Sequence, residues 1–171
     1  ALLLHGGGKA RIQASVHYVV LNLAGSSLFL IAVGILYGAT GTLNMADMGY
    51  KLASLPAERE GLVTAGALML LVVFGLKAAI LPLYFWLPRA YAAAPAPVAA
   101  LFAIMTKVGI YAILRVYSLI FGEQAGGLVA LEQPWVWWLA LATLAAAGVG
   151  VMAARDLRLL VAYLVLISVG T

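Results

Sequence analysis

Long apolar runs alternate with short polar segments along the whole chain. Four runs have about the 20 residues that a helix needs to cross a bilayer, at residues 16–37, 61–81, 97–119 and 135–153. A fifth begins near Leu157 and is still apolar at Thr171, so we expect a truncated span over 157–171. The pattern predicts an all-α fold, a polytopic transmembrane helix bundle. Because the sequence opens on Ala1 rather than Met, we expect residues 1–171 to be one transmembrane domain fragment.

The composition supports lipid as the solvent of this chain. Hydrophobic residues make up 65% of it and charged residues 9%, whereas soluble domains are about 25% charged. The net charge of +4 comes from single, scattered bases, which does not indicate a nucleic-acid partner. There is no cysteine, and His5 and His17 are too few and too terminal for a convincing metal site.

The distribution of basic residues predicts how the chain is oriented. Cytoplasmic loops of membrane proteins are enriched in Lys and Arg. Alternate counting of the spans places five bases on one face, namely Lys9, Arg11, Arg89, Arg155 and Arg158. The opposite face carries Lys51, Arg59 and Arg115 together with most of the acids. We therefore expect the first face to be cytoplasmic.

Two lysines lie where an apolar helix should contain none. Lys77 is near the end of the second run, and Lys107 is about ten residues into the third, near mid-bilayer. A charged Lys at the centre of a membrane helix costs about 2.5–3.5 kcal/mol, and such groups commonly mark ion or proton routes. Snorkelling or a structural hydrogen bond is the alternative, although the interface is too far from Lys107 for snorkelling. A protonated Lys repels cations, so a proton function is more direct than a sodium function.

Pro82 predicts a broken or kinked helix directly after Lys77. Proline removes a backbone donor and disturbs the helix at the carbonyl of residue 78, so the second span is expected to continue, broken, to about residue 92. Discontinuous helices are a recurrent device of transporters. The following segment carries Tyr84 and Tyr91, whose hydroxyls either line a hydrated path or belong to an interfacial aromatic belt with Arg89 as anchor.

The segment FGLKAAILPLYFWLPRAYAAAPAPVAALFAIMTKVGIYAILR resembles a known family, as does DLRLLVAY at residues 156–163. Both are similar to the antiporter-like membrane subunits shared by respiratory complex I, Mrp-type multisubunit cation/proton antiporters and membrane hydrogenases. The order of Lys, Pro, aromatic residues, WLP and second Lys most resembles the D subunit of the Mrp Na⁺/H⁺ antiporters. The resemblance extends over essentially the whole chain.

This resemblance implies a fragment of a fourteen-helix subunit with two inverted five-helix repeats, each containing a broken helix. The chain would begin before helix six and end within helix ten. Lys77 and Lys107 would be the proton-translocating lysines of helices seven and eight, and a helix-five glutamate that pairs with Lys77 would lie upstream of Ala1. Respiratory members often read HxWLPDAH around Tyr84, Arg89 and Tyr91, and often have histidine where this chain has Ser168. These departures favour the Mrp type.

The predicted function is that of an antiporter subunit relaying protons through Lys77 and Lys107, coupled to exchange of Na⁺ or another monovalent cation. We expect a multi-pass protein of the bacterial cytoplasmic membrane, with the lipid bilayer, other subunits of a hetero-oligomeric complex, protons and monovalent cations as partners. Two alternatives remain: a proton-pumping subunit of a respiratory NADH:quinone oxidoreductase, and a non-transporting scaffold. No motif indicates a nucleotide, quinone, flavin or iron–sulfur site, so we expect no cofactor and no metal.

Overall fold

The computed structural model describes residues 8–123, 125–129, 131 and 133–171. His5 lies outside these residues. All regular structure among them is helical, which confirms the predicted all-α fold. The main helices are α1 (Lys9–Thr40), α2 (Met45–Ala53), α3 (Ala57–Ala78), α4 (Trp86–Ala93), α5 (Ala96–Ile120), α6 (Gln133–Ala153) and α7 (Leu157–Gly170). Two short 3₁₀ turns, η2 (Leu83–Phe85) and η3 (Gly126–Leu128), lie in the connections.

Four helical segments of the described chain are long and apolar enough to cross a membrane. They are Arg11–Thr40, Ala57–Ala93, Ala96–Ile120 and Gly126–Ala153, and the shorter helix α7 is also apolar. The first helix extends beyond the predicted span of 16–37 at both ends. The connection between the first two predicted spans contains a helix, α2, whose 9 residues are too few to cross a membrane.

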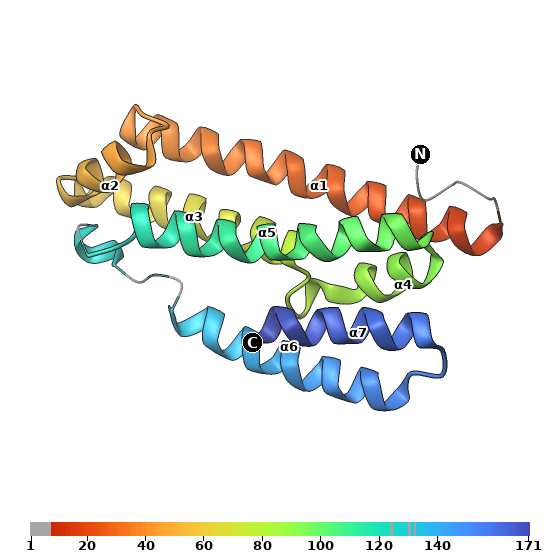
Figure 1. Ribbon diagram of the computed structural model, residues 1–171. Coiled ribbons are helices and arrows are strands. Elements are labelled where there is room, and N and C mark those ends of the chain that lie inside the picture. Colours follow the sequence, from red (N-terminus) through yellow and green to blue (C-terminus); the bar gives the residue numbers. More distant parts are fainter. Residues whose placement is uncertain (1–7, 124, 130, 132) are drawn as a thin grey trace.

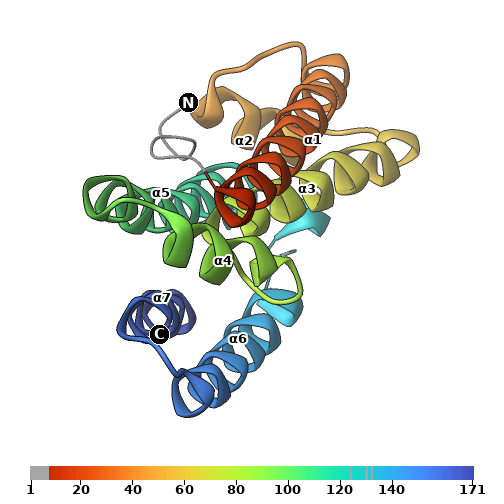
Figure 2. The ribbon, with the colours of Figure 1, turned by 90° about the vertical axis from the view of Figure 1, so that its right-hand side faces the viewer.

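The long helices run side by side along one axis (Figure 1). Helix α3 packs against α1 on one side and α5 on the other, while α6 and α7 form a hairpin whose α7 packs against α4 and α5. In the end-on view of Figure 2, α1 and the α6–α7 hairpin lie on opposite sides of the α3–α5 pair. The start of α1, helix α4 and the α6–α7 turn share one end of the bundle.

Many large apolar side chains point outward from this bundle. Leu30 on α1, Leu114 on α5 and Trp138 on α6 are 70%, 65% and 70% exposed. A soluble protein rarely exposes so many apolar residues together, whereas contact with lipid or with other membrane helices accommodates them. The exterior therefore agrees with a multi-pass membrane protein.

A close approach between α3 and α5 depends on one glycine. A Cβ atom added at Gly109 of α5 would lie 2.6 Å from the backbone nitrogen of Ala78, the last residue of α3. Small residues at helix interfaces let backbones approach closely where lipid removes the usual hydrophobic driving force. Gly109 thus places α5 directly against the end of α3, where the candidate site lies.

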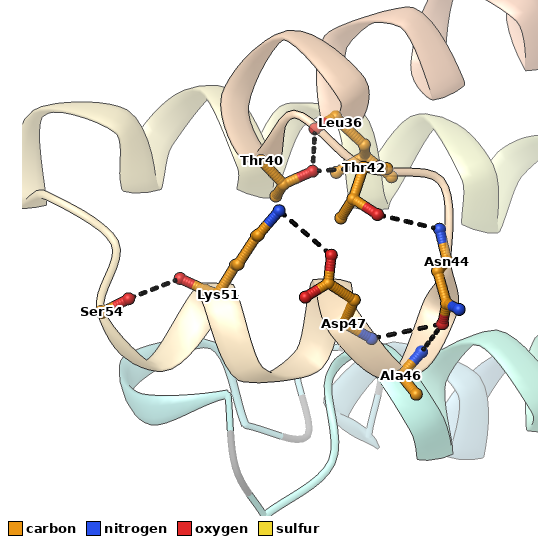
Figure 3. A network of polar contacts seen from close by, with 8 residues as sticks. All are labelled: Leu36, Thr40, Thr42, Asn44, Ala46, Asp47, Lys51 and Ser54. Carbon is orange, nitrogen blue, oxygen red and sulfur yellow. Dashed lines mark hydrogen bonds and ion pairs between the residues drawn. The ribbon is translucent and has the colours of Figure 1, made fainter.

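The end of the bundle opposite α4 is closed by polar contacts around α2 (Figure 3). The Oδ1 atom of Asn44 accepts hydrogen bonds from the backbone N–H groups of Ala46 and Asp47, which caps the helix. One turn later Lys51 forms an ion pair of 3.0 Å with Asp47. Lys51 and then Thr42 hold the pKa of the Asp47 carboxyl below its usual value.

Candidate functional site

The predicted helix break lies immediately after Lys77. Helix α3 ends at Ala78, and Ala79 adopts a left-handed conformation with φ of 63°. The chain resumes with η2 and then α4 after Pro82. The break predicted from Pro82 at residue 78 is therefore confirmed, and it places Lys77 in the last turn of α3.

The backbone groups freed by this break find specific partners. The N–H of Ile80 donates to the Gly75 carbonyl at 2.9 Å, and the indole Nε1 of Trp86 donates to the Leu76 carbonyl at 3.0 Å. The N–H of Leu81 donates to Oγ1 of Thr143 on α6 at 2.9 Å. Unpaired backbone is costly at membrane depth, so these bonds are what makes an interrupted helix tolerable there.

The Lys77 ammonium is held by a neutral side chain from α1. Its Nζ lies 2.5 Å from Oδ1 of Asn22, and the Nδ2 of Asn22 donates to the Tyr18 carbonyl at 2.8 Å. This second bond turns the amide so that its oxygen faces the lysine. Both side chains are half-buried. Lys77 thus forms its hydrogen bond with a neighbouring helix at the level of the break. Its side chain does not extend along α3 toward the membrane surface.

Lys77 and Asn22 line a cavity between α1, α3 and α5. Its volume is about 490 Å³, and Ser26 adds a hydroxyl to an otherwise mostly apolar wall that includes Phe74 and Trp86. The lining contains no carboxylate among the residues described. The cavity can admit water or another side chain beside the ammonium.

Lys107 lies near the middle of α5 and bonds to α7. Its Nζ donates to the Ser168 carbonyl at 2.9 Å and also contacts the Ser168 hydroxyl. That hydroxyl donates to the Val165 carbonyl at 2.7 Å. From the sequence, Ser168 stood out only as a departure from histidine, whereas in the structure it is the partner of Lys107.

The two lysines face opposite neighbours. Lys77 reaches α1 and Lys107 reaches α7, and these helices lie on opposite sides of the α3–α5 pair (Figure 2). None of the described cavities is lined by both lysines. A proton moving between them would have to cross the interface between α3 and α5 with intervening water.

The two candidate tyrosines have different surroundings. Tyr84 in η2 is half-buried, stacks on Phe85 with ring centroids 4.6 Å apart, and lines a cavity with His17 and Arg89. Tyr91 in α4 is 4% exposed, and its buried hydroxyl has no hydrogen-bond partner among the described residues. The structure thus separates these residues instead of gathering them around the lysines.

Three polar residues of this site were missed from the sequence. Asn22 and Thr143 interrupt apolar runs, but a single amide or hydroxyl there is common enough to be read as helix packing. Trp86 belongs to the WLP motif, but the acceptor of its indole N–H depends on the path of the chain after the break. The interruption of the apolar pattern at Asn22 was the available signal.

Comparison with protein families supplies an independent finding. The family model described as "NADH:quinone oxidoreductase/Mrp antiporter, TM" matches residues 2–170. The D subunit of a probable K(+)/H(+) antiporter from Rhizobium meliloti (strain 1021) is 50% identical over 99% of this chain and 32% of its own length. The D subunit of the Na(+)/H(+) antiporter from Bacillus subtilis (strain 168) is 43% identical over 99% of this chain and 33% of its own length. The chain spans about a third of these relatives.

Solved structures show the same arrangement of helices. A chain of the Mrp complex from Dietzia sp. DQ12-45-1b matches with a TM-score of 0.78 at 29% identity, over 95% of this chain and 29% of that one. A chain of the membrane-bound sulfane sulfur reductase, an archaeal respiratory membrane complex, matches with a TM-score of 0.84 at 32% identity, over 99% of this chain and 34% of that one. The resemblance inferred from the lysine and proline motifs is thereby confirmed.

Proposed function

The chain belongs to the NADH:quinone oxidoreductase/Mrp antiporter transmembrane family, and we propose that it forms the part of a monovalent cation/proton antiporter subunit that carries two proton-relaying lysines. The observation that carries this proposal is the Lys77 ammonium beside a broken helix, held by a neutral amide in a cavity. Relatives named as K(+)/H(+) and Na(+)/H(+) antiporter subunits support it.

In the proposed mechanism Lys77 is the switch. A carboxylate from elsewhere in the whole subunit pairs with the ammonium and stabilises its charge; when that pair opens, Lys77 releases its proton more readily. Asn22 then accepts a hydrogen bond from the lysine without supplying a counter-charge. The proton passes along water to Lys107, and Tyr84 and Tyr91 lie along the hydrated part of the route. Countermovement of Na⁺ or K⁺ completes the exchange.

The proposed setting is a hetero-oligomeric complex of membrane subunits. The protein is a multi-pass membrane protein, as its family and the four long apolar helical segments of its described part indicate. We place it in the bacterial cytoplasmic membrane because the curated relatives are bacterial. We also propose that residues 1–171 correspond to the middle of a fourteen-helix subunit, with the remaining helices supplied by the rest of that subunit.

Replacing Lys77 tests the central claim. Lys77→Ala in the whole subunit removes the ammonium from the break, so cation-dependent proton movement in everted vesicles is expected to fall to the background of vesicles without the antiporter. The matched control is Lys51→Ala, which removes a lysine from the exposed ion pair on α2. Full exchange by Lys77→Ala, with the complex assembled, would remove Lys77 from the mechanism.

Two further measurements separate the alternatives. A proton-pumping subunit of an NADH:quinone oxidoreductase takes its energy from electron transfer, so exchange that proceeds without NADH and is unchanged by adding it favours the antiporter.

A scaffold whose lysines only bond neighbouring helices predicts that Lys77→Met and Lys107→Met reduce co-purification of the complex together with transport. Retained assembly with lost transport excludes the scaffold.

A further inference from the structure

A polar cavity lies at the end of the bundle where α1 begins. Its volume is about 530 Å³, and four polar side chains line it from four different elements: His17 on α1, Tyr84 on η2, Arg89 on α4 and Tyr163 on α7. None of these residues lines the Lys77 cavity or forms one of the described hydrogen bonds of Lys107. The exchange mechanism gives no role to His17 or Arg89.

The chemistry of this lining suits an anion. Arg89 presents several N–H donors and a positive charge, and the two phenols and the imidazole can each donate a hydrogen bond. Arg89 and His17 form no hydrogen bond or ion pair with any residue the structure describes, and no carboxylate of that part of the chain lines the cavity. Guanidinium groups bind phosphate in a fixed, two-pronged geometry.

A larger apolar cavity adjoins the polar one. It measures about 920 Å³, lies between α1 and α4, and shares both His17 and Arg89 with the polar cavity. Apart from Gln13, its remaining lining is apolar and includes Ile12, Val16 and Trp86. A charged head region joined to an apolar channel matches a ligand that has an anionic group and a hydrocarbon chain.

The depth of the two cavities also fits a lipid. His17 lies next to the start of the predicted first span, and Arg89 lies in α4 beyond the helix break, at the end of the bundle that carries the α6–α7 turn (Figure 1). Basic pockets between transmembrane helices at this level bind anionic lipid headgroups.

We propose that these adjoining cavities bind one anionic phospholipid, with its phosphate on Arg89 and His17 and an acyl chain between α1 and α4 beside Trp86. The apolar cavity is the reason for choosing a phospholipid over free phosphate, which would leave that channel unused. The two phosphate contacts, Arg89 and His17, take part in no step of the proposed exchange, and the tests of this site measure lipid binding alone.

Native mass spectrometry of the purified whole subunit tests the headgroup contact. Phosphatidylglycerol is titrated against phosphatidylcholine with identical acyl chains. Arg89→Gln is expected to weaken phosphatidylglycerol binding at least about fivefold, the effect of removing one basic residue near a membrane surface. The control is Arg155→Gln, which removes an exposed base at the same end that lines neither cavity. Equal losses in both variants, or none in Arg89→Gln, would overturn the proposal.

Tryptophan fluorescence tests the acyl chain without changing the headgroup contacts. Phosphatidylglycerol with brominated chains is expected to quench the wild-type subunit more than Trp86→Phe, whereas brominated phosphatidylcholine should quench both alike. Inorganic phosphate up to millimolar concentration is expected not to displace the bound phosphatidylglycerol. Identical quenching of wild type and Trp86→Phe by the anionic lipid, or displacement by phosphate alone, contradicts a phospholipid in this site.

Discussion

The amide of Asn22 sets the environment in which Lys77 gains and loses its proton. Because its Nδ2 is committed to the Tyr18 carbonyl, Oδ1 is the atom left to face the ammonium. A neutral acceptor stabilises the charged lysine less than a carboxylate would, since it lacks a counter-charge. The site thus leaves room for an acid partner to change how tightly Lys77 holds its proton.

Substitutions at Asn22 should separate positioning from packing. Asn22→Asp places a permanent counter-charge beside Lys77, so exchange in vesicles should slow and its pH optimum should move to higher pH. Asn22→Leu removes the acceptor and should lower exchange about tenfold at the original optimum, the value of a weak hydrogen bond to a charged group. Ser26→Ala is the control, because Ser26 lines the same cavity but bonds only to its own helix. An unshifted profile in Asn22→Asp would contradict this role.

The sequence identified the two lysines within the predicted spans by their charge, but it did not identify the side chains that accept their hydrogen bonds. A lysine in an apolar run is anomalous whatever surrounds it, so Lys77 and Lys107 could be singled out from the pattern. Their acceptors, Asn22 and Ser168, lie 55 and 61 residues away in the sequence. Which polar side chain meets which lysine depends on helix rotation and packing, and a single sequence does not encode these in any local pattern.

The broken helix depends on a hydroxyl from a distant helix. Thr143 on α6 is fully buried, donates to the Leu139 carbonyl and accepts from the Leu81 N–H in the break. Proline chemistry predicted where α3 would end. The contact from Thr143 could not be predicted, because it requires the α6–α7 hairpin to pack against the break.

Thr143→Val should therefore destabilise the subunit through the break. The variant keeps the shape of the side chain but leaves the Leu81 N–H without this acceptor, at a cost of about 1–3 kcal/mol. The midpoint of thermal unfolding of the purified subunit is the measurement, and it should fall. Thr143→Ser keeps the hydroxyl and should stay closer to wild type. Equal midpoints for the valine variant and wild type would mean that the bond to Leu81 contributes nothing.

Helix α2, which lies outside the predicted spans, carries a titratable contact between Asp47 and Lys51. The pKa of Asp47 is lowered chiefly by its hydrogen bond with Lys51, so the stabilisation it gives α2 is present above the ordinary aspartate pKa of about 3.9. That stabilisation is lost as pH falls through the lower folded value. Lys51→Met should raise the Asp47 pKa toward the ordinary value. A carboxyl carbon NMR titration in nanodiscs measures it, and an unchanged Asp47 titration would contradict the assigned cause.

On the scale of the whole molecule, the two ends of the bundle carry different sets of charged residues. Arg89 and Arg155 lie on α4 and in the α6–α7 turn, at the end where α1 begins, while Lys51 and Glu58 lie on α2 and at the start of α3, at the other end (Figure 1). This is the segregation that alternate counting of the spans predicted. The overall fold was predictable because membrane helices are long and apolar, whereas the amphipathic helix α2 was too short to detect.

The orientation of the bundle in the membrane is the remaining prediction, and the absence of cysteine in this chain makes it testable. Cytoplasmic loops are enriched in bases, so the α6–α7 turn should face the cytoplasm and the end of α2 should face the opposite side. In whole cells, with any cysteines in the rest of the subunit replaced, Ser54→Cys should react with a membrane-impermeant maleimide while Ala154→Cys should not. In everted vesicles the two should exchange behaviour. The reverse pattern would invert the topology, and with it the side of the membrane on which Arg89 and His17 lie.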